Sequence, residues 1–185
     1  MPGLKGSFLI AVLAGAAAVI GWATYHHVAH PLPLGAIPMR RLANNVWVSE
    51  QISPSQLRQL RGQQFGAVVD LRPDGEVANQ PSSNAMAQAA GEAGLAFTYD
   101  PVPHGDVPDS AVTGLQRALV SQHQSVLLYC RSGRRAARTW ALAEASTVGG
   151  MDAASIKDAV RRVGQSVDDL QIQIDDRIAA RPSSG

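Results

Sequence analysis

A short apolar run at residues 126–129 leads through a loop that opens on Cys130 into an alanine-rich and leucine-containing segment at residues 136–145. The first has the length and composition of a buried parallel strand, and the second has those of a helix. The loop therefore lies at a helix N-terminus, where backbone N–H groups converge and the helix dipole adds about half a positive charge. Gly133 permits the backbone angles that this convergence needs. The sequence thus predicts an anion-binding loop that begins at a cysteine.

Cys130 is the only cysteine in the chain. A lone cysteine is most often a small buried hydrophobe. Packing alone, however, does not require Ser132 and Gly133 to follow it, nor Arg131 and Arg134 to surround it. Because the positive end of a helix stabilises a thiolate over a thiol, we expect Cys130 to be a nucleophile near neutral pH.

The overall composition argues against several classes of function. The 185 residues include 16 Lys and Arg against 15 Asp and Glu, so no global field attracts nucleic acid and the basic cluster at the loop is local. The sequence contains no metal-ligand cluster, dinucleotide fingerprint or nucleotide phosphate loop. We therefore expect no metal, no cofactor and no nucleic-acid partner.

The sequence of residues 1–30 predicts a membrane segment. Residues 6–25 carry no charged side chain, and a helix of about 20 such residues spans the hydrocarbon core of a bilayer. We expect residues 1–30 to hold one transmembrane helix that anchors the chain to the inner membrane, with the folded domain on the periplasmic side. A cleaved signal and a secreted protein are the alternative. The proline-rich residues 31–41 are expected to form an extended linker.

Strand and helix patterns alternate along residues 42–181, which predicts an α/β domain with a mostly parallel central sheet and helices on both faces. The expected strands are residues 45–48, 67–71, 95–99 and 126–129. The expected helices are residues 54–61, 83–93, 110–122, 136–145, 152–163 and 166–180, with Ser53 and Asp109 as N-caps and Gly94 as a C-terminal glycine.

Sites in such sheets form beyond the carboxyl ends of the strands. Three loops follow strands of the predicted sheet, at residues 72–76, 101–109 and 130–135. Because parallel strands end at one edge, we expect the three loops to converge.

Within this framework, the segments VDLRPDGE at residues 69–76, QPS at residues 80–82 and YCRSG at residues 129–133, followed by Arg135, resemble the phosphatase-like domain of the beta-lactamase-hydrolase-like family. That family shares its fold with protein tyrosine and dual-specificity phosphatases, and some members are labelled sulfur transferases. The resemblance covers about residues 42–181. It implies a three-layer phosphatase-like domain.

The resemblance also implies roles for individual residues. Cys130 would attack phosphorus to form a cysteinyl-phosphate, while the amides of the loop and the Arg135 guanidinium hold the phosphoryl oxygens. Asp106 would protonate the leaving oxygen, although an ordinary turn carboxylate is the alternative for this residue.

Three further residues are candidates for the mouth of the site: Arg72, Asp74 and His104. For the first two, a buried ion pair that also includes Glu76 and shapes the loop is an equal alternative. For His104, the alternative is a solvated loop histidine.

The loop departs from the tyrosine phosphatase pattern. Only four residues separate Cys130 from Arg135, where five are usual, and Tyr129 and Ala136 occupy positions that usually hold histidine and a hydroxyl residue. A shorter loop encloses less volume and suits a terminal sulfur atom at least as well as a phosphate.

Three functions therefore remain open. The first is a hydrolase that acts on a phosphorylated small molecule or phosphoprotein. The second is a rhodanese-like sulfurtransferase that takes sulfur from a sulfane donor as a Cys130 persulfide. The third is a non-catalytic module that binds anions or phosphoproteins.

Overall fold

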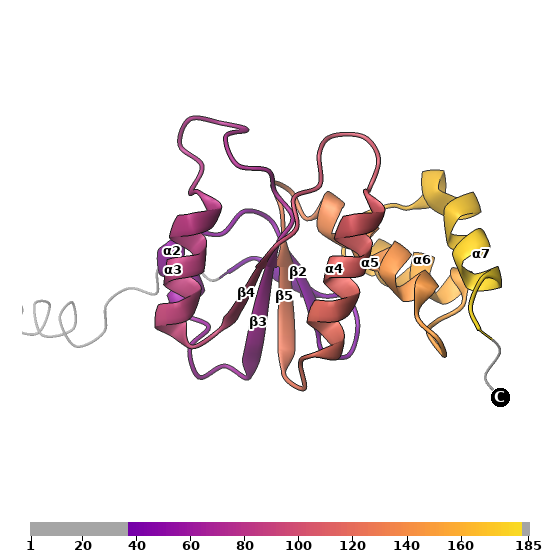
Figure 1. Ribbon diagram of the computed structural model, residues 1–185, viewed down its shortest axis with the longest axis horizontal. Coiled ribbons are helices and arrows are strands. Elements are labelled where there is room, and N and C mark those ends of the chain that lie inside the picture. The colour runs from indigo at the N-terminus through magenta and orange to yellow at the C-terminus, as the bar shows by residue number, and fades with distance from the viewer. Residues whose placement is uncertain (1–36, 183–185) are drawn as a thin grey trace, which may run out of the picture. The chain divides into compact units, whose positions relative to one another are not determined.

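A computed structural model describes residues 37–182 of the chain (Figure 1). The predicted membrane helix and most of the predicted linker lie outside these residues. Within residues 37–182, none of the helices has the length and apolar character that crossing a bilayer requires.

The centre of the domain is a five-stranded sheet with the strand order β1-β2-β5-β3-β4. Its strands are β1 (Met39–Arg41), β2 (Val46–Ser49), β3 (Phe65–Asp70), β4 (Ala96–Tyr99) and β5 (Ser125–Tyr129). β1 pairs antiparallel with β2, and all other neighbours are parallel. The prediction of a mostly parallel sheet is therefore confirmed.

Helices cover both faces of the sheet (Figure 1). α2 (Pro54–Arg58) and α3 (Ser83–Ala93) pack on one face. The other face carries α4 (Asp109–Val120), α5 (Arg134–Ser146), α6 (Ala153–Arg162), the 3₁₀ turn η1 (Asp168–Leu170) and α7 (Gln171–Ala179). This is the three-layer arrangement that the sequence predicts.

Burial on both faces explains why the central strand reads as a continuous apolar run. Leu127 and Tyr129 of β5 pack in the cluster beneath α2 and α3, whereas Leu128 packs in the cluster beneath the other helices. All three side chains have 0% exposure. In a strand that is covered on both faces, apolar residues do not alternate with polar ones, because neither face meets solvent.

α5 lies at the centre of its layer, since it packs against α4, α6, α7 and the sheet. It is buried around most of its circumference, including Ala136, Ala137 and Trp140. Small alanines let the neighbouring elements approach closely, and the helix therefore holds its N-terminal residues in a fixed position above β5.

Several helix ends follow the predicted signals. Ser53 caps α2 in a capping box with Gln56, and Pro54 occupies its first turn. Gly94 ends α3 with φ at 74°, a left-handed conformation that favours glycine.

Other predicted boundaries need correction. The predicted cap role of Asp109 is wrong, because Pro108 occupies the N-cap position without a side-chain cap. Asp109 lies instead in the first turn of α4 and pairs with Arg177 of α7. The predicted helix at residues 166–180 is divided into η1 and α7.

Candidate active site

The Arg135 guanidinium joins the three loops that the sequence predicts to converge. Its Nη1 donates to Glu76 Oε1 at 2.6 Å and to the Val102 carbonyl oxygen at 2.9 Å, and its Nη2 donates to Glu76 Oε2 at 2.9 Å. Glu76 follows β3, Val102 follows β4 and Arg135 lies in the first turn of α5. The convergence of the loops beyond the carboxyl ends of the strands is therefore confirmed.

Cys130 directly follows β5 and is completely buried, with 0% exposure. The Arg135 guanidinium lies beside its sulfur. The pKa of Arg135 is raised, first by the hydrogen bond to Glu76 and further by the charge and hydrogen bonding of Cys130, against an opposing effect of burial. Arg135 therefore interacts with both Glu76 and Cys130.

The carbonyl groups of the loop after Cys130 accept hydrogen bonds from two other segments of the domain. The Arg131 carbonyl oxygen accepts from the Gln51 amide at 3.4 Å, and that of Ser132 accepts from Gln165 Nε2 at 3.1 Å. Gly133 is the N-cap of α5 and adopts φ 81°, a left-handed conformation that favours glycine, as the sequence predicts for this loop.

Glu76 forms ion pairs with two arginines at this site. Besides Arg135, its carboxylate accepts from Arg72 Nε at 2.8 Å and lies 3.5 Å from His104 Nε2. Its side chain is 12% exposed. The Arg135 hydrogen bond, helped by Arg72, lowers the pKa of Glu76 to about 2 against the opposing effect of burial. The carboxylate thus fixes both arginines at neutral pH.

Replacement of Glu76 by Gln is expected to lower the free energy of unfolding by about 3 kcal/mol, because it leaves two largely buried guanidinium groups without their counter-ion. The contribution of the Glu76 charge is complete above the ordinary pKa of a glutamate and is lost as the pH falls towards 2. Urea unfolding at neutral pH measures the loss. The control is Glu92→Gln, which breaks an exposed pair with Arg58 and should cost less than about 1 kcal/mol. Equal losses in both variants would contradict this role of Glu76.

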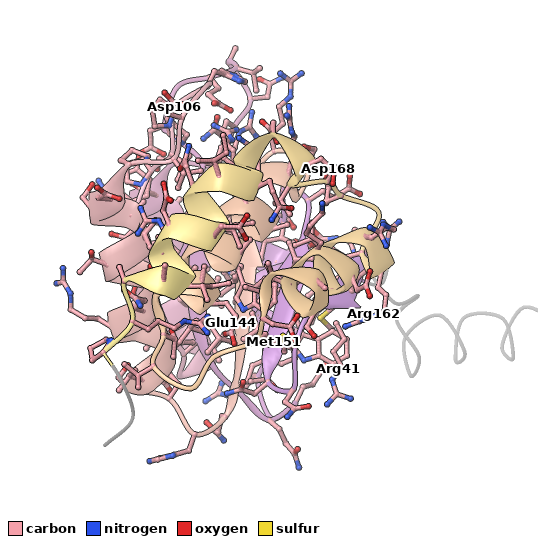
Figure 2. All side chains as sticks on the ribbon, turned by 90° about the vertical axis from the view of Figure 1, so that its right-hand side faces the viewer. Arg41, Asp106, Glu144, Met151, Arg162 and Asp168 are labelled. Carbon is pink, nitrogen blue, oxygen red and sulfur yellow. The ribbon has the colours of Figure 1, made fainter. Side chains whose placement is uncertain are left out.

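A cavity of about 540 Å³ opens at the Cys130 loop. It is lined by Pro103, His104, Gly105, Asp106, Arg131, Ser132, Arg134, Arg135, Arg138 and Asp169. Asp106 is exposed on the loop between β4 and α4, which Figure 2 shows at one end of the molecule. Cys130 lies beneath the loop and does not line the cavity. Within residues 37–182, no cluster of three His, Cys, Asp or Glu side chains offers a metal site.

Two of the three residues predicted to line the mouth do not line this cavity. Arg72 is 4% exposed and is bound to Glu76 and, through Nη1, to Gln51 Oε1 at 2.9 Å. Asp74 accepts hydrogen bonds from the Ser83 amide and hydroxyl at 2.8 and 2.7 Å, which ties its loop to the start of α3. For Arg72, the structure therefore shows the buried ion pair with Glu76 that was the alternative to a place at the mouth of the site. His104 does line the cavity, and its side chain is 78% exposed.

A buried acidic residue beneath the loop was not identified from the sequence. Asp70, the last residue of β3, is 2% exposed and stands opposite Tyr129 in the register of β3 and β5. Burial raises the pKa of Asp70 to about 6, although the nearby Tyr129 hydroxyl and the Arg72 amide favour its charged form. Its Oδ1 accepts from that amide at 2.9 Å. Its place at the end of a strand, within the VDLRPD segment, is the signal that could have revealed it.

Asp70→Asn is expected to remove a pH dependence of stability. The folded carboxyl binds its proton more tightly than the unfolded one, so its stabilising contribution is complete below pH 3.8 and is lost as the pH rises through about 6. A shift of about two pKa units corresponds to about 3 kcal/mol. We therefore compare the free energies of unfolding of the wild type and of Asp70→Asn at several pH values. The wild type should lose about 3 kcal/mol relative to the variant between about pH 4 and pH 7. A constant difference would show that Asp70 titrates normally.

Together, the sheet-end cysteine loop, the arginine of the following helix and the cavity above them define a phosphatase-like α/β domain. The sequence model for the phosphatase-like domain of beta-lactamase hydrolase-like proteins matches residues 38–147. The chain belongs to this family.

Curated relatives carry the same name. A beta-lactamase hydrolase-like protein from Xylella fastidiosa is 35% identical over 102 residues, which are 55% of this chain and 22% of the relative. A protein of the same name from Agrobacterium fabrum is 27% identical over 105 residues, which are 57% of this chain and 24% of the relative. The chain thus matches less than a quarter of the length of these relatives.

Solved structures share the fold. A Neisseria meningitidis protein assigned as a phosphatase aligns with a TM-score of 0.61 at 25% identity, over 74% of this chain and 96% of that chain. The catalytic core of a PP-IP phosphatase from S. cerevisiae, in complex with citrate, aligns with a TM-score of 0.57 at 12% identity, over 81% of this chain and 90% of that chain. The matching family model is that of a phosphatase-like domain, and both of these solved structures are described as phosphatases.

Proposed function

We propose that this chain is a cysteine-dependent hydrolase that acts on phosphorylated substrates through a cysteinyl-phosphate. The observation that carries the proposal is the position of Arg135, beside the Cys130 sulfur and at the wall of a basic cavity that also holds Asp106. This arrangement supplies a nucleophile, a guanidinium for the phosphoryl oxygens and a proton donor.

In the first step, the Cys130 thiolate attacks phosphorus, and an S–P bond forms as the bond from phosphorus to the leaving oxygen breaks. Asp106 donates its proton to that oxygen. The amides of the loop and Arg135 stabilise the charge on the phosphoryl oxygens. In the second step, water attacks phosphorus, Asp106 accepts its proton, and Cys130 is released as a thiolate.

Access to the sulfur requires a local movement. Cys130 has 0% exposure, and Arg135 is held by Glu76 and the Val102 carbonyl oxygen. On binding, a phosphoryl group would replace the Val102 carbonyl as a partner of Arg135, while Glu76 keeps the guanidinium in place.

The substrate in this proposal is a phosphorylated small molecule or a phosphoprotein. We also propose that the N-terminal segment anchors the domain to the inner membrane on its periplasmic side. Fusion of alkaline phosphatase to the C-terminus of the chain tests that topology, since the reporter is active only after export.

A sulfurtransferase is the second candidate, and the complete burial of Cys130 under a four-residue loop favours it. The thiolate would attack the outer sulfur of thiosulfate, with cleavage of its S–S bond and release of sulfite. The resulting persulfide would pass that sulfur to cyanide and yield thiocyanate. A single sulfur atom needs less room than a phosphoryl group, and neither transfer requires a general acid.

Proton demand distinguishes the two reactions, which makes Asp106→Asn the test. With the 185-residue chain in mild detergent, we expect this variant to lower kcat for an alkyl phosphate by about 10²-fold, and that for an activated aryl phosphate by less, because the better leaving group needs less protonation. The matched control is Asp109→Asn, which removes an exposed carboxylate just beyond the same loop and should leave kcat within about twofold.

Thiosulfate is assayed in parallel. Consumption of thiosulfate without phosphate release, together with a silent Asp106→Asn variant, would refute the phosphatase and support the sulfurtransferase. Inactivity of the folded chain toward both would instead support the non-catalytic anion-binding module.

A further inference from the structure

Four arginines extend from the Cys130 loop along the first turns of α5. Arg131, Arg134, Arg135 and Arg138 all line the cavity. Arg134 and Arg138 are four residues apart in the sequence, so they lie on the same side of the helix, about one turn apart. Arg135 alone among these guanidinium groups lies at Cys130, which leaves positive charge beyond the part of the cavity that one phosphoryl group would fill.

Arg138 is the most buried member of this row, with 5% exposure. Its Nη1 donates to both carboxylate oxygens of Asp169, at 2.6 and 2.8 Å. The hydrogen bond from Arg138 lowers the pKa of Asp169, and the charge of Arg134 adds to this effect. Asp169 itself is 57% exposed and belongs to η1. Asp169 also lines the cavity, so a carboxylate of the protein occupies a position at Arg138 where an anion would bind.

The remaining lining of the cavity favours small polar anions over an aromatic phosphoester. Pro103 and Gly105 are its only nonpolar residues, and the other lining residues are charged or polar. The ring of a phosphotyrosine gains affinity by packing against large apolar or aromatic side chains, and the lining of this cavity includes no Phe, Tyr, Trp, Leu, Ile, Val or Met. Exposed Arg131 and Arg134 donate no side-chain hydrogen bond within residues 37–182, so both are available to a ligand.

We infer that Arg134 and Arg138 form a second anion subsite, held by the Asp169 carboxylate in the free protein, and that the preferred ligand is a small molecule with two or more anionic groups, one for Cys130 and one for this subsite. The inference rests on the proposed function for the placement of the first anionic group at Cys130. Figure 2 shows Asp168, the neighbour of Asp169, at the same end of the molecule as Asp106. The ligand displaces Asp169 as it binds, so removal of this carboxylate strengthens binding.

The test compares tripolyphosphate, which carries several linked phosphate groups, with inorganic phosphate and phosphotyrosine. Dissociation constants are measured by calorimetry on the 185-residue chain carrying Cys130→Ser, so that turnover is not needed. We expect tripolyphosphate to bind most tightly. Asp169→Asn should increase its preference over inorganic phosphate about five- to tenfold, because one competing charge is lost, whereas Arg138→Gln should decrease it by a similar factor.

The control is Asp168→Asn, which makes the same change in net charge next to Asp169 but removes a carboxylate that pairs with Lys157 outside the cavity. It should leave the preference unchanged. If Arg138→Gln does not fold, the exposed Arg134→Gln takes its place and should also lower the preference.

A preference that is unchanged or reduced in Asp169→Asn would overturn the inference, as would tighter binding of phosphotyrosine than of tripolyphosphate. If the binding pattern is as expected but the wild-type chain hydrolyses no phosphoester, the proposed function fails and the second subsite stands.

Discussion

Replacement of Cys130 by serine is expected to lower kcat/KM for an aryl phosphate by at least about 10⁴-fold. The serine hydroxyl stays protonated at neutral pH, so the variant lacks an anionic nucleophile at this position. When catalytic residues act together, removal of the nucleophile alone abolishes nearly all of the rate enhancement. Steady-state hydrolysis by the 185-residue chain measures the effect.

The same variant should keep its fold. Serine is nearly the size of cysteine, and Arg135 keeps its three hydrogen bonds to Glu76 and Val102. Urea unfolding provides the control, and a change of no more than about 3 kcal/mol is expected for a buried hydroxyl. Retention of a tenth or more of the wild-type kcat/KM in the folded variant would exclude Cys130 as the nucleophile.

Arg135→Lys is expected to lower kcat/KM by about 10²- to 10³-fold while keeping the positive charge. The Arg135 guanidinium binds both oxygens of Glu76 and still directs a donor to Val102, the position that a phosphoryl oxygen would take. A lysine ammonium is a single point on a flexible stem and cannot hold Glu76 and a phosphoryl group in fixed positions together. The loss should fall mainly on kcat, since the guanidinium stabilises charge that develops in the transition state.

The matched control is Arg58→Lys at the end of α2, where an exposed arginine pairs with Glu92. This control should keep kcat/KM within about twofold, because it lies outside the site. An equally mild effect of Arg135→Lys would show that charge alone is required at position 135, and that the bidentate geometry has no part in the reaction.

The alternation of strands and helices could be predicted because both kinds of element are strongly marked in this sequence. The run at residues 126–129 is apolar throughout, since it is buried on both faces, and the start of α2 carries its Ser53 cap and Pro54. β1 was not predicted. It is a three-residue edge strand with the sequence MRR, in which only antiparallel pairing with β2 fixes the backbone. Such an element has no periodicity of its own to detect.

The C-terminal helix shows another limit. Its sequence pattern continues across residues 166–180, but the structure has a 3₁₀ turn at Asp168–Leu170 before α7. Asp168 pairs with Lys157 and Asp169 pairs with Arg138, so tertiary ion pairs from α6 and α5 fix this turn. The helix propensity of neighbouring residues cannot predict ion pairs between residues that are far apart in the sequence.

In the site, the sequence identified the residues near the cysteine but not the network that fixes them. The helix N-terminus after β5 placed Cys130, Gly133 and Arg135 together because they are close in the sequence. The pairing of Arg135 with Glu76 joins residues 59 positions apart and depends on the parallel register of β3 and β5. The same register buries Asp70 opposite Tyr129, and the desolvation that raises the pKa of Asp70 follows from this tertiary arrangement.

The most direct test of the account is the identity of the group that Cys130 carries during turnover. The 185-residue chain is mixed with an aryl phosphate, quenched in acid within one turnover and digested, and the peptide that contains Cys130 is analysed by mass spectrometry. The account predicts a phosphoryl group on Cys130 that is absent from the Cys130→Ser variant and accumulates in Asp106→Asn, where the second step lacks its base. Phosphate release with an unmodified Cys130, or a Cys130 persulfide after thiosulfate with no phosphoryl adduct from any phosphoester, would contradict it.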